Sequence, residues 1–248
     1  MRALSTLDRR TVLKALSLAP MMAVAMPQTV RAEVSKAGLI SIDVCLLQPE
    51  IGEGPFYIAP ALMRSDIAEN RPGLPMALRL QVVTADCVPV VAARVDIWQC
   101  DAAGRYSGVA SQSGDGTPSL TFLRGSQITD AAGIVAFQTI FPGCYPGRPT
   151  HIHYKVILQD NTVLTSQIFF DEAVISAIYE DHEDHEDHEA YATQGAMRGK
   201  INGTGAAAGT IAAVRMTEAD GAMEAALVIG IAADGRAAGL LDWLWRQG

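Results

Sequence analysis

Basic charge is scarce in this chain, and its scarcity excludes a class of partner. The 248 residues include 19 Lys and Arg against 27 Asp and Glu, which gives a formal net charge of −8. A surface with this balance repels the phosphates of nucleic acids. We therefore expect no nucleic acid among its partners, and the charge does not argue for binding to anionic lipid.

Long apolar runs are scarce as well. The apolar run 15–26 is shorter than the ~20 residues that a membrane-spanning helix needs. It follows the pair Arg9-Arg10 and precedes a small residue, an order typical of a secretory signal on the twin-arginine route. The alternative is an amphipathic helix of the folded domain. We expect residues 1–32 to be a cleaved signal, 33–248 to form one domain without a stable membrane span, and the protein to be exported to the periplasm or the extracellular space.

Cysteine is also uncommon. The four cysteines have spacings that match no zinc-binding pattern. In an oxidising compartment one or two disulfides can form, and three connectivities are open if all four residues pair. Folding before export would favour reduced thiols, and we expect Cys144 to be without a disulfide. The four are Cys45, Cys87, Cys100 and Cys144.

Strand patterns dominate what the chain does contain. Short runs alternate apolar and polar residues and are separated by turns such as Asp-Ala-Ala-Gly at Asp101 and Asp130. A period of two with this punctuation is typical of an antiparallel β-sandwich or barrel. We predict an all-β fold, an antiparallel β-sandwich with long loops and few short helices, one of them over 171–179. The expected strands are 77–84, 93–98, 133–140, 150–158, 163–170, 209–216 and 223–232.

A pair of histidines begins one of these strands. His151 and His153 stand two residues apart, just before an apolar run at 156–158. On a strand, residues i and i+2 face the same side, so both imidazole rings would project together. Two adjacent imidazoles on one rigid element form half of a metal site. The alternative is a polar alternation that faces solvent on an edge strand.

Two tyrosines follow turns that would fix their rings. Tyr106 lies just after the turn 101–104, and Tyr145 follows Pro142 and Gly143. A neutral phenol is a poor metal ligand, but a strongly polarising cation can deprotonate it, as metals do for water and thiols. Two phenolates with two imidazoles suit a hard trivalent ion and would stabilise Fe(III) over Fe(II). This set differs from the two-His-one-carboxylate site of ferrous oxygenases.

The motifs around these residues together resemble one enzyme family. In their order and spacing they are similar to the intradiol ring-cleavage dioxygenases, the family of protocatechuate 3,4-dioxygenase and catechol 1,2-dioxygenase, and most of all to its small exported members. The similarity covers most of residues 45–180. It lies in the segments 53–57, 95–101, 104–108, 121–125, 142–145, 151–153 and 165–167.

This resemblance implies a cofactor and a reaction. Tyr106, Tyr145, His151 and His153 would hold one non-haem Fe(III) per chain, with hydroxide as a fifth ligand. Tyr145 and His153 would be axial. A catechol-type diol would bind as a chelating dianion and displace Tyr145, whose phenolate and the released hydroxide take the two diol protons. The substrate ring would then meet O2 and be cleaved between its two hydroxylated carbons, which gives a muconate-type diacid.

The resemblance also places four residues around the substrate. Arg148 would stabilise negative charge that develops on the ring. Gln167 would orient the substrate or the oxygen intermediate. Phe56 and Tyr57 would wall the pocket.

Two positions depart from the family pattern. Gln99 stands where exported relatives commonly have His, and Gly147 replaces a bulky residue of the protocatechuate enzymes. We expect both positions near the pocket mouth, where they bear on substrate choice.

An acidic repeat lies outside this resemblance. Residues 180–189 repeat Glu-Asp-His and hold the other three histidines of the chain. The clustered like charges repel one another and favour solvent, so we expect a tolerated surface insertion rather than a second metal site. Two rival functions stay open: a non-enzymatic exported β-sandwich binding module, and a metal-binding protein that acts through this repeat.

Overall fold

The computed structural model of the protein describes residues 47–59, 62–109, 120–145, 147–180, 191, 194, 212–216 and 223–232. All of them belong to the unit Glu33–Gly248. The predicted signal over 1–32, Cys45 and residues 181–189 of the acidic repeat lie outside the described residues. What the sequence predicts for them stays a prediction.

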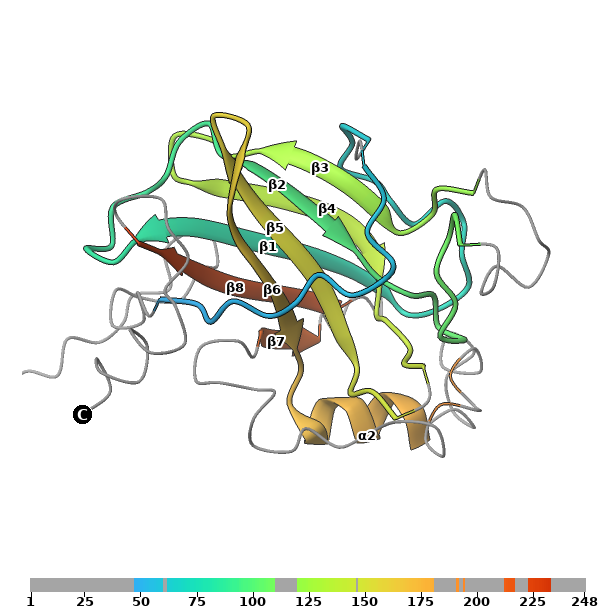
Figure 1. The fold of residues 1–248 in the computed structure, drawn as a ribbon. Helices are drawn as coiled ribbons and strands as arrows, with labels where there is room; N and C mark the ends of the chain where they lie inside the picture. Colours follow the sequence, from blue (N-terminus) through green and yellow to red (C-terminus); the bar gives the residue numbers. More distant parts are fainter. Residues whose placement is uncertain are drawn as a thin grey trace, which may run out of the picture. The chain divides into compact units, whose positions relative to one another are not determined.

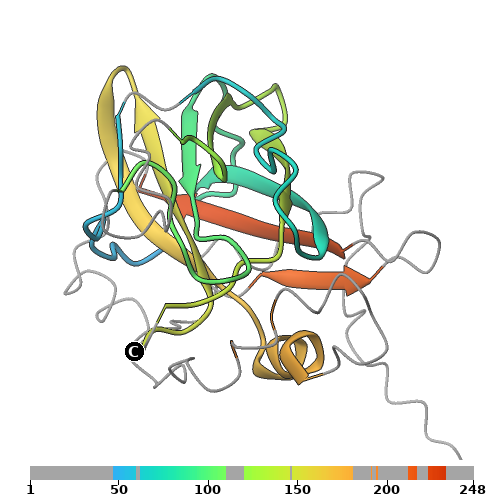
Figure 2. The same cartoon turned by 90° about the vertical axis from the view of Figure 1, so that its right-hand side faces the viewer.

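Two four-stranded β-sheets make up the described fold. The first contains β1 (Pro75–Thr84), β4 (Ile134–Ile140), β7 (Ala213–Met216) and β8 (Met223–Ile231) in the order β4-β1-β8-β7. The second contains β2 (Arg94–Trp98), β3 (Arg124–Ile128), β5 (His151–Leu158) and β6 (Asn161–Phe169) in the order β3-β2-β5-β6. Figure 1 labels these strands, and in Figure 2 the yellow β5 and β6 stand in a different layer from the orange-red β8.

The prediction of an all-β sandwich is confirmed, with one difference in strand direction. β1 pairs with β4 in antiparallel fashion, but it pairs with β8 in parallel. The chain completes the second sheet before β8 joins β1, so this pairing is not a hairpin and its direction is not set by a short turn. Period-two patterns locate strands but do not encode this direction.

β3 is a strand that the sequence did not predict. Its five residues, Arg-Gly-Ser-Gln-Ile, show no apolar alternation. On its inner side stands Gly125, where an added Cβ would lie 2.6 Å from Ile67 Cγ2. The neighbouring segment thus fills the space that an apolar side chain would otherwise take, which removes the sequence signal.

Alternating apolar side chains fill the space between the sheets. Leu78 and Leu80 of β1 belong to one buried cluster with Ile152, Tyr154 and Val156 of β5. Burying an aliphatic side chain of this size stabilises the fold by about 1.5–3 kcal/mol. The cluster therefore fixes which side of β5 faces the core and which faces outward.

One helix, α2 (Glu172–Glu180), begins and ends within one residue of the predicted helix. Asp171 caps it, since its Oδ1 accepts a hydrogen bond from a backbone N–H of the first turn at 2.8 Å. Near its end, Tyr179 Oη donates to Pro142 O at 3.1 Å and shares a hydrogen bond with Thr150 Oγ1 at 2.6 Å. These bonds support the two segments that lead to the candidate ligands. No helix in the described part of the chain is long and apolar enough to cross a membrane.

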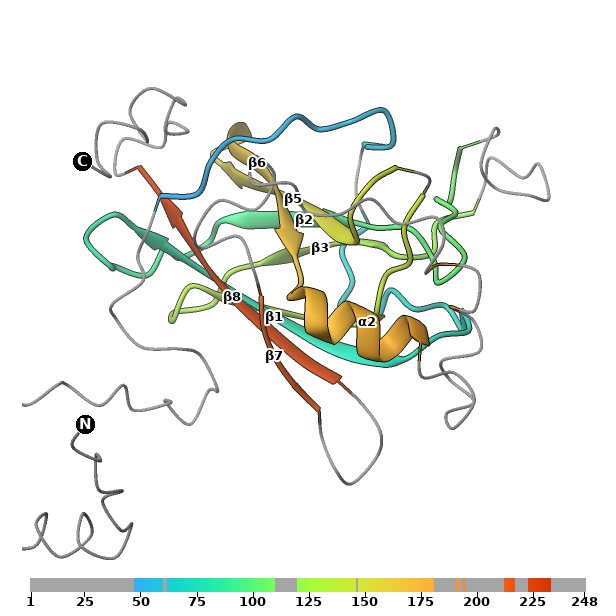
Figure 3. The same ribbon diagram turned by 90° about the horizontal axis from the view of Figure 1, so that it is seen from below.

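Residues 47–58, named here the covering segment, run across the outer side of β5 and β6, as the blue ribbon in Figures 1 and 3 shows. Gln48 N donates to Gly230 O of β8 at 2.9 Å, and Ile51 N donates to Thr165 O of β6 at 2.8 Å. The covering segment thus bridges one edge of each sheet. Beyond that edge it shields the outer face of the second sheet.

The three cysteines that the structure describes divide into two kinds. Cys87 is disulfide-bonded, whereas Cys100 and Cys144 are buried thiols. The expectation that Cys144 has no disulfide is therefore confirmed. Cys100 Sγ donates to Gly143 O at 3.3 Å, so this thiol supports the loop that leads to Tyr145.

Candidate metal centre

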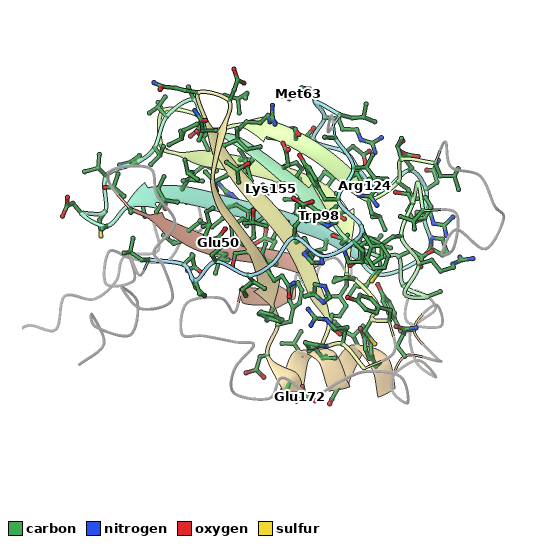
Figure 4. All side chains as sticks on the ribbon, in the orientation of Figure 1. Glu50, Met63, Trp98, Arg124, Lys155 and Glu172 are labelled. Carbon is green, nitrogen blue, oxygen red and sulfur yellow. The ribbon has the colours of Figure 1, made fainter. Side chains whose placement is uncertain are left out.

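The outer face of the second sheet carries the candidate site. Strand pairing aligns Arg124 of β3 with Trp98 of β2, Trp98 with His153 of β5, and His153 with Gln167 of β6. Residues paired across strands point to the same face, so these four side chains form one row. Figure 4 shows Trp98 and Arg124 at neighbouring ends of β2 and β3.

The two histidines face the same side of β5, as the sequence predicts. Their Nε2 atoms lie 3.0 Å apart, and their ring centroids lie 4.6 Å apart with the planes at 78°. His151 Nδ1 donates to Pro149 O at 2.7 Å in the tautomer that leaves the lone pair on Nε2. Two ligand atoms that each lie about 2.1 Å from one metal ion, with a ligand–metal–ligand angle of about 90°, are ~3.0 Å from each other. The pair therefore has the spacing of adjacent metal ligands.

Burial keeps both histidines neutral. Desolvation and, to a smaller extent, the charge of Arg148 lower the pKa of His151 from 6.5 to about 4, although the bond to Pro149 O opposes them. Desolvation, His151 and the cations Arg148 and Arg124 lower the pKa of His153 from 6.5 to about 2. Both rings are therefore uncharged at pH 7, which is the form that binds a metal ion.

Tyr106 is buried, and its phenol oxygen has no partner. No described residue forms a hydrogen bond with Tyr106 Oη. Its ring stacks on Phe56 at 4.4 Å and lies 6.4 Å from the His153 ring. Burial raises the pKa of this phenol well above 10.0, and Cys100 and Tyr145 add to the effect. A buried polar atom without a partner costs about 1–3 kcal/mol, so this oxygen calls for a ligand that the described residues do not supply.

Backbone contacts hold the two tyrosine loops against each other. A Cβ on Gly104 would lie 2.2 Å from Cys144 O, and a Cβ on Gly143 would lie 2.5 Å from Ala102 O. Gly104 also has a φ of +82°, a left-handed conformation that favours glycine. Gly143 N donates to Asp101 O at 3.1 Å. These turns therefore set the separation between the two phenol rings.

Tyr145 completes the group of four. Its ring centroid lies 6.0 Å from that of His151 and 6.1 Å from that of Tyr106. Unlike Tyr106, Tyr145 is partly exposed. The structure thus brings the four predicted ligands to one place, with one tyrosine enclosed and the other partly exposed.

The donor set fits the predicted ion. Among the described residues, no group of three or more His, Cys, Asp or Glu side chains could hold a metal ion. The two imidazoles therefore need the phenols as further donors. Oxygen donors that become anionic on binding suit a hard ion, so the residues present fit Fe(III).

Arg148 and Gln167 are joined to the histidine pair. Arg148 Nη2 donates to Gln167 Oε1 at 3.2 Å, and Gln167 Nε2 lies 3.4 Å from His153 Nδ1. Arg148 Nε is buried and has no partner among the described residues. The guanidinium therefore keeps a donor free beside the candidate ligands, where the sequence predicts the substrate.

The two residues predicted to wall the pocket lie on the covering segment and face different neighbours. Phe56 contacts the ring of Tyr106, as described above. The Tyr57 ring lies 4.9 Å from that of Trp98 and 3.7 Å from Lys155 Nζ, and Tyr57 Oη donates to Asp96 Oδ2 at 2.9 Å. Phe56 thus contacts a candidate ligand directly. The hydroxyl of Tyr57 is instead held by Asp96, which lies two residues before Trp98 on β2.

Two contacts to His153 were not foreseen from the sequence. The Trp98 ring is parallel to the His153 ring within 5° at 4.9 Å, and a Cβ on Gly54 would lie 3.5 Å from His153 Cε1. Together they hold the imidazole between an indole and the backbone of the covering segment. The sequence pattern that could have predicted the Trp98 contact is the alternation of Arg94, Asp96 and Trp98, which places the indole on the outer face of β2.

The prediction that Gln99 lies near the pocket mouth is wrong. Gln99 is buried, its Nε2 donates to Ile140 O at 2.9 Å, and its Oε1 accepts from Thr139 Oγ1 at 3.1 Å. It therefore ties the end of β2 to β4 on the core side, because it follows Trp98 and faces the opposite way. Gly147, by contrast, has open space around an added Cβ.

Comparison with known proteins identifies the class to which this fold and site belong. Residues 52–183, more than half of the chain, match the model of a protein family described as Dioxygenase. The solved structure of an intradiol ring-cleavage dioxygenase from Tetranychus urticae is 32% identical, with a TM-score of 0.65 over 80% of this chain and 100% of that one. The chain therefore belongs to the intradiol ring-cleavage dioxygenase family, which is a family of enzymes.

Curated relatives with named substrates match a shorter part. Chlorocatechol 1,2-dioxygenase from Pseudomonas sp. is 28% identical over 140 residues, which is 48% of this chain and 54% of that protein. Hydroxyquinol 1,2-dioxygenase from Rhizobium sp. is 31% identical over 137 residues, which is 47% of this chain and 45% of that protein. The chain thus spans about half the length of these curated relatives.

Proposed function

We propose that this chain is a non-haem Fe(III)-dependent dioxygenase that cleaves a catechol-type diol between its two hydroxylated carbons with O2. One observation carries the proposal: the unpartnered, buried Tyr106 phenol lies beside two neutral histidines whose Nε2 atoms are 3.0 Å apart. Tyr106, Tyr145, His151 and His153 would hold the iron. When bound, Fe(III) would accept both diol oxygens and draw electron density from the ring, which makes the ring reactive toward O2.

The two tyrosines are suited to different tasks. Tyr106 is buried and stacked on Phe56, so it stays in place during the reaction. Tyr145 is partly exposed and can turn away without disturbing the core. Once displaced by the substrate, its phenolate oxygen takes a proton from one diol hydroxyl, which is general-base work.

Arg148 and Gln167 act on the substrate. The Arg148 guanidinium is fixed by its bond to Gln167 Oε1 and keeps a free Nε–H. A partly buried cation stabilises negative charge on the substrate ring more strongly than a fully solvated cation would. Gln167, between Arg148 and His153, sets the direction of that guanidinium and orients the bound diol.

The substrate is an aromatic diol of the catechol type. The names of the relatives, chlorocatechol and hydroxyquinol 1,2-dioxygenases, support this class. The apolar Phe56 ring beside Tyr106 offers an aromatic surface that suits an aromatic ring.

The test combines three measurements: iron content, visible absorption and oxygen uptake. Purified, iron-loaded protein should contain one iron per chain and be wine-red from phenolate-to-iron charge transfer. Oxygen uptake with a panel of catechol, protocatechuate, hydroxyquinol and chlorocatechol should reveal the preferred diol. Tyr106→Phe should shift or bleach the colour and reduce turnover, whereas colourless protein that binds no iron would instead favour the binding module.

The acidic repeat offers a direct control for the remaining rival. Deleting residues 180–189 should leave iron content, colour and turnover intact. Loss of all three on deletion would favour a protein that acts through the repeat.

We further propose that residues 1–32 direct export by the twin-arginine route. The support is the pair Arg9-Arg10 ahead of the short apolar run. Mass spectrometry of the exported protein should find its N-terminus near Glu33, and replacing both arginines by lysine should block export.

A further inference from the structure

Arg124, at the start of β3, is a buried guanidinium whose hydrogen-bond partners are all uncharged. It is 7% exposed. Its Nη1 donates to Phe56 O at 2.6 Å, its Nη2 to Ser107 O at 2.8 Å and its Nε to Ser107 Oγ at 3.0 Å. In the described part of the chain it forms no ion pair, whereas four other arginines pair with Asp or Glu: Arg64, Arg71, Arg94 and Arg105.

An ordinary stabilising ion pair therefore does not account for Arg124. A buried cation without a counter-ion is costly to keep in a fold. What the guanidinium offers here is a rigid, planar fork with donors in fixed directions. Such a fork can hold two separate stretches of backbone in one relative position.

The two stretches that Arg124 joins meet at Tyr106. Ser107 follows Tyr106 directly in the sequence. Phe56 stacks on the Tyr106 ring at 4.4 Å with the planes at 24°. Arg124 thus holds the backbone next to the phenol on one side and the ring that packs against the phenol on the other.

We propose that Arg124 is the positioning residue for Tyr106, an inference that rests on the function proposed above. It acts through Ser107 and Phe56, and its described hydrogen bonds reach none of the four candidate ligands. Because no described residue forms a hydrogen bond with Tyr106 Oη, these indirect contacts decide where the oxygen points. Arg124 therefore sets the direction of the enclosed phenol ligand and, through it, the strength of the ligand's bond to iron.

The covering segment has two other polar anchors, and they provide matched controls. Lys155 Nζ pairs with Glu53, and Asp96 accepts the hydrogen bond from Tyr57 Oη. Lys155 follows His153 by two residues on β5, so it lies on the same face of the sheet as Arg124, and Figure 4 labels both residues. In contrast to Arg124, Lys155 has no bond to the loop that carries Tyr106 among its described contacts.

The experiment compares Arg124→Met, Arg124→Lys and Lys155→Met in the full-length, iron-loaded protein. The readouts are iron per chain, the visible phenolate-to-iron band, kcat and KM for the best diol. Arg124→Met should keep the iron but shift and broaden the band, and should lower kcat by about tenfold or more with a much smaller change in KM. Arg124→Lys should recover part of the band, since an ammonium keeps the charge but cannot hold both segments in one plane. Lys155→Met should leave the band at its wild-type position.

Two results would overturn the inference. A wild-type band and kcat in Arg124→Met would show that Tyr106 is positioned without it. An equal band shift in Lys155→Met would assign the effect to the covering segment as a whole. If Arg124→Met does not fold, Arg124→Lys and Ser107→Ala decide the question by the same readouts. Colourless wild-type protein would count against the proposed function instead, so the two failures are distinguishable.

Discussion

β1 of the first sheet and β5 of the second are buried in different ways. In β1, Leu78 and Leu80 are buried while Arg79 and Gln81 are partly exposed. In β5, every residue from His151 to Ile157 is buried. The alternating pattern belongs to a sheet with one solvated face, whereas continuous burial belongs to a sheet covered on both sides.

The difference shows what the covering segment achieves. The outer face of β5 is as shielded as its core face, yet it carries His151, His153 and Lys155. Buried polar groups need partners, and this face supplies them: Gln167 for His153 and Glu53 for Lys155. The shielded polar face thus makes a site in which imidazoles stay neutral, which is the form that the metal ion proposed above would bind.

The largest effect is expected from a substitution on the covered face. His153→Ala should abolish the visible band and reduce turnover on the order of 10³-fold or more, because it removes a ligand rather than a supporting contact. Arg79→Ala, on the partly exposed face of β1, should leave iron content and turnover near wild type. Metal analysis and oxygen uptake measure both variants. Normal iron content and turnover in His153→Ala would contradict the assignment of the site to this face.

A second comparison concerns two glycines near this face, one in a crowded loop and one with open space around it. Gly104 and Gly147 have similar φ angles of +82° and +79°, but only Gly104 has close neighbours around an added Cβ. Gly104→Ala should lower the free energy of unfolding by about 3 kcal/mol, since the backbone at Cys144 O must move. Gly147→Ala should lower it by only ~1 kcal/mol, the cost of the left-handed conformation. Urea unfolding of both variants measures the difference, and equal losses would mean that the two tyrosine loops are not pressed together.

A third test stays on the covered face but spares the ligands. Arg148→Ala should retain iron and colour and lower kcat by about 10²-fold, because it removes a cation that stabilises charge on the substrate. Arg94→Ala, which removes a more exposed guanidinium from the same sheet face, should change kcat by less than about threefold. Steady-state kinetics with the best diol compares the two variants. Full activity in Arg148→Ala would remove it from the reaction.

The face on which each strand residue lies could largely be predicted from the sequence, because local periodicity determines which residues share a face. The pairs His151–His153 and Leu78–Leu80 required only the rule of alternation. The parallel pairing of β1 with β8 could not be predicted, since direction depends on contacts between segments far apart in the chain. The role of Gln99 was misjudged for the same reason: its partners lie on β4 and are known only once the sheets are packed.

The burial of the outer face of the second sheet could not be predicted from the sequence. Whether a polar side chain on the outer side of a strand is solvated or buried depends on what crosses over it. Arg124 and Lys155 are buried because the covering segment brings Phe56 O and Glu53 to them. Burial of the outer face is therefore a tertiary property, even though the residues on that face follow from periodicity.

The smallest effect is expected on the other side of β5, and it sharpens the comparison at single-residue resolution. Ile152 lies between the two histidines in the sequence but is buried in the core cluster. Ile152→Val should lower the free energy of unfolding by about 1 kcal/mol, since it deletes one buried methylene. The visible band and kcat should remain unchanged, because the ring of neither histidine contacts the core side of the strand. Thermal unfolding and the absorption spectrum measure the two consequences separately, and a shifted band in Ile152→Val would mean that core packing, and not the outer face alone, sets the geometry of the pair.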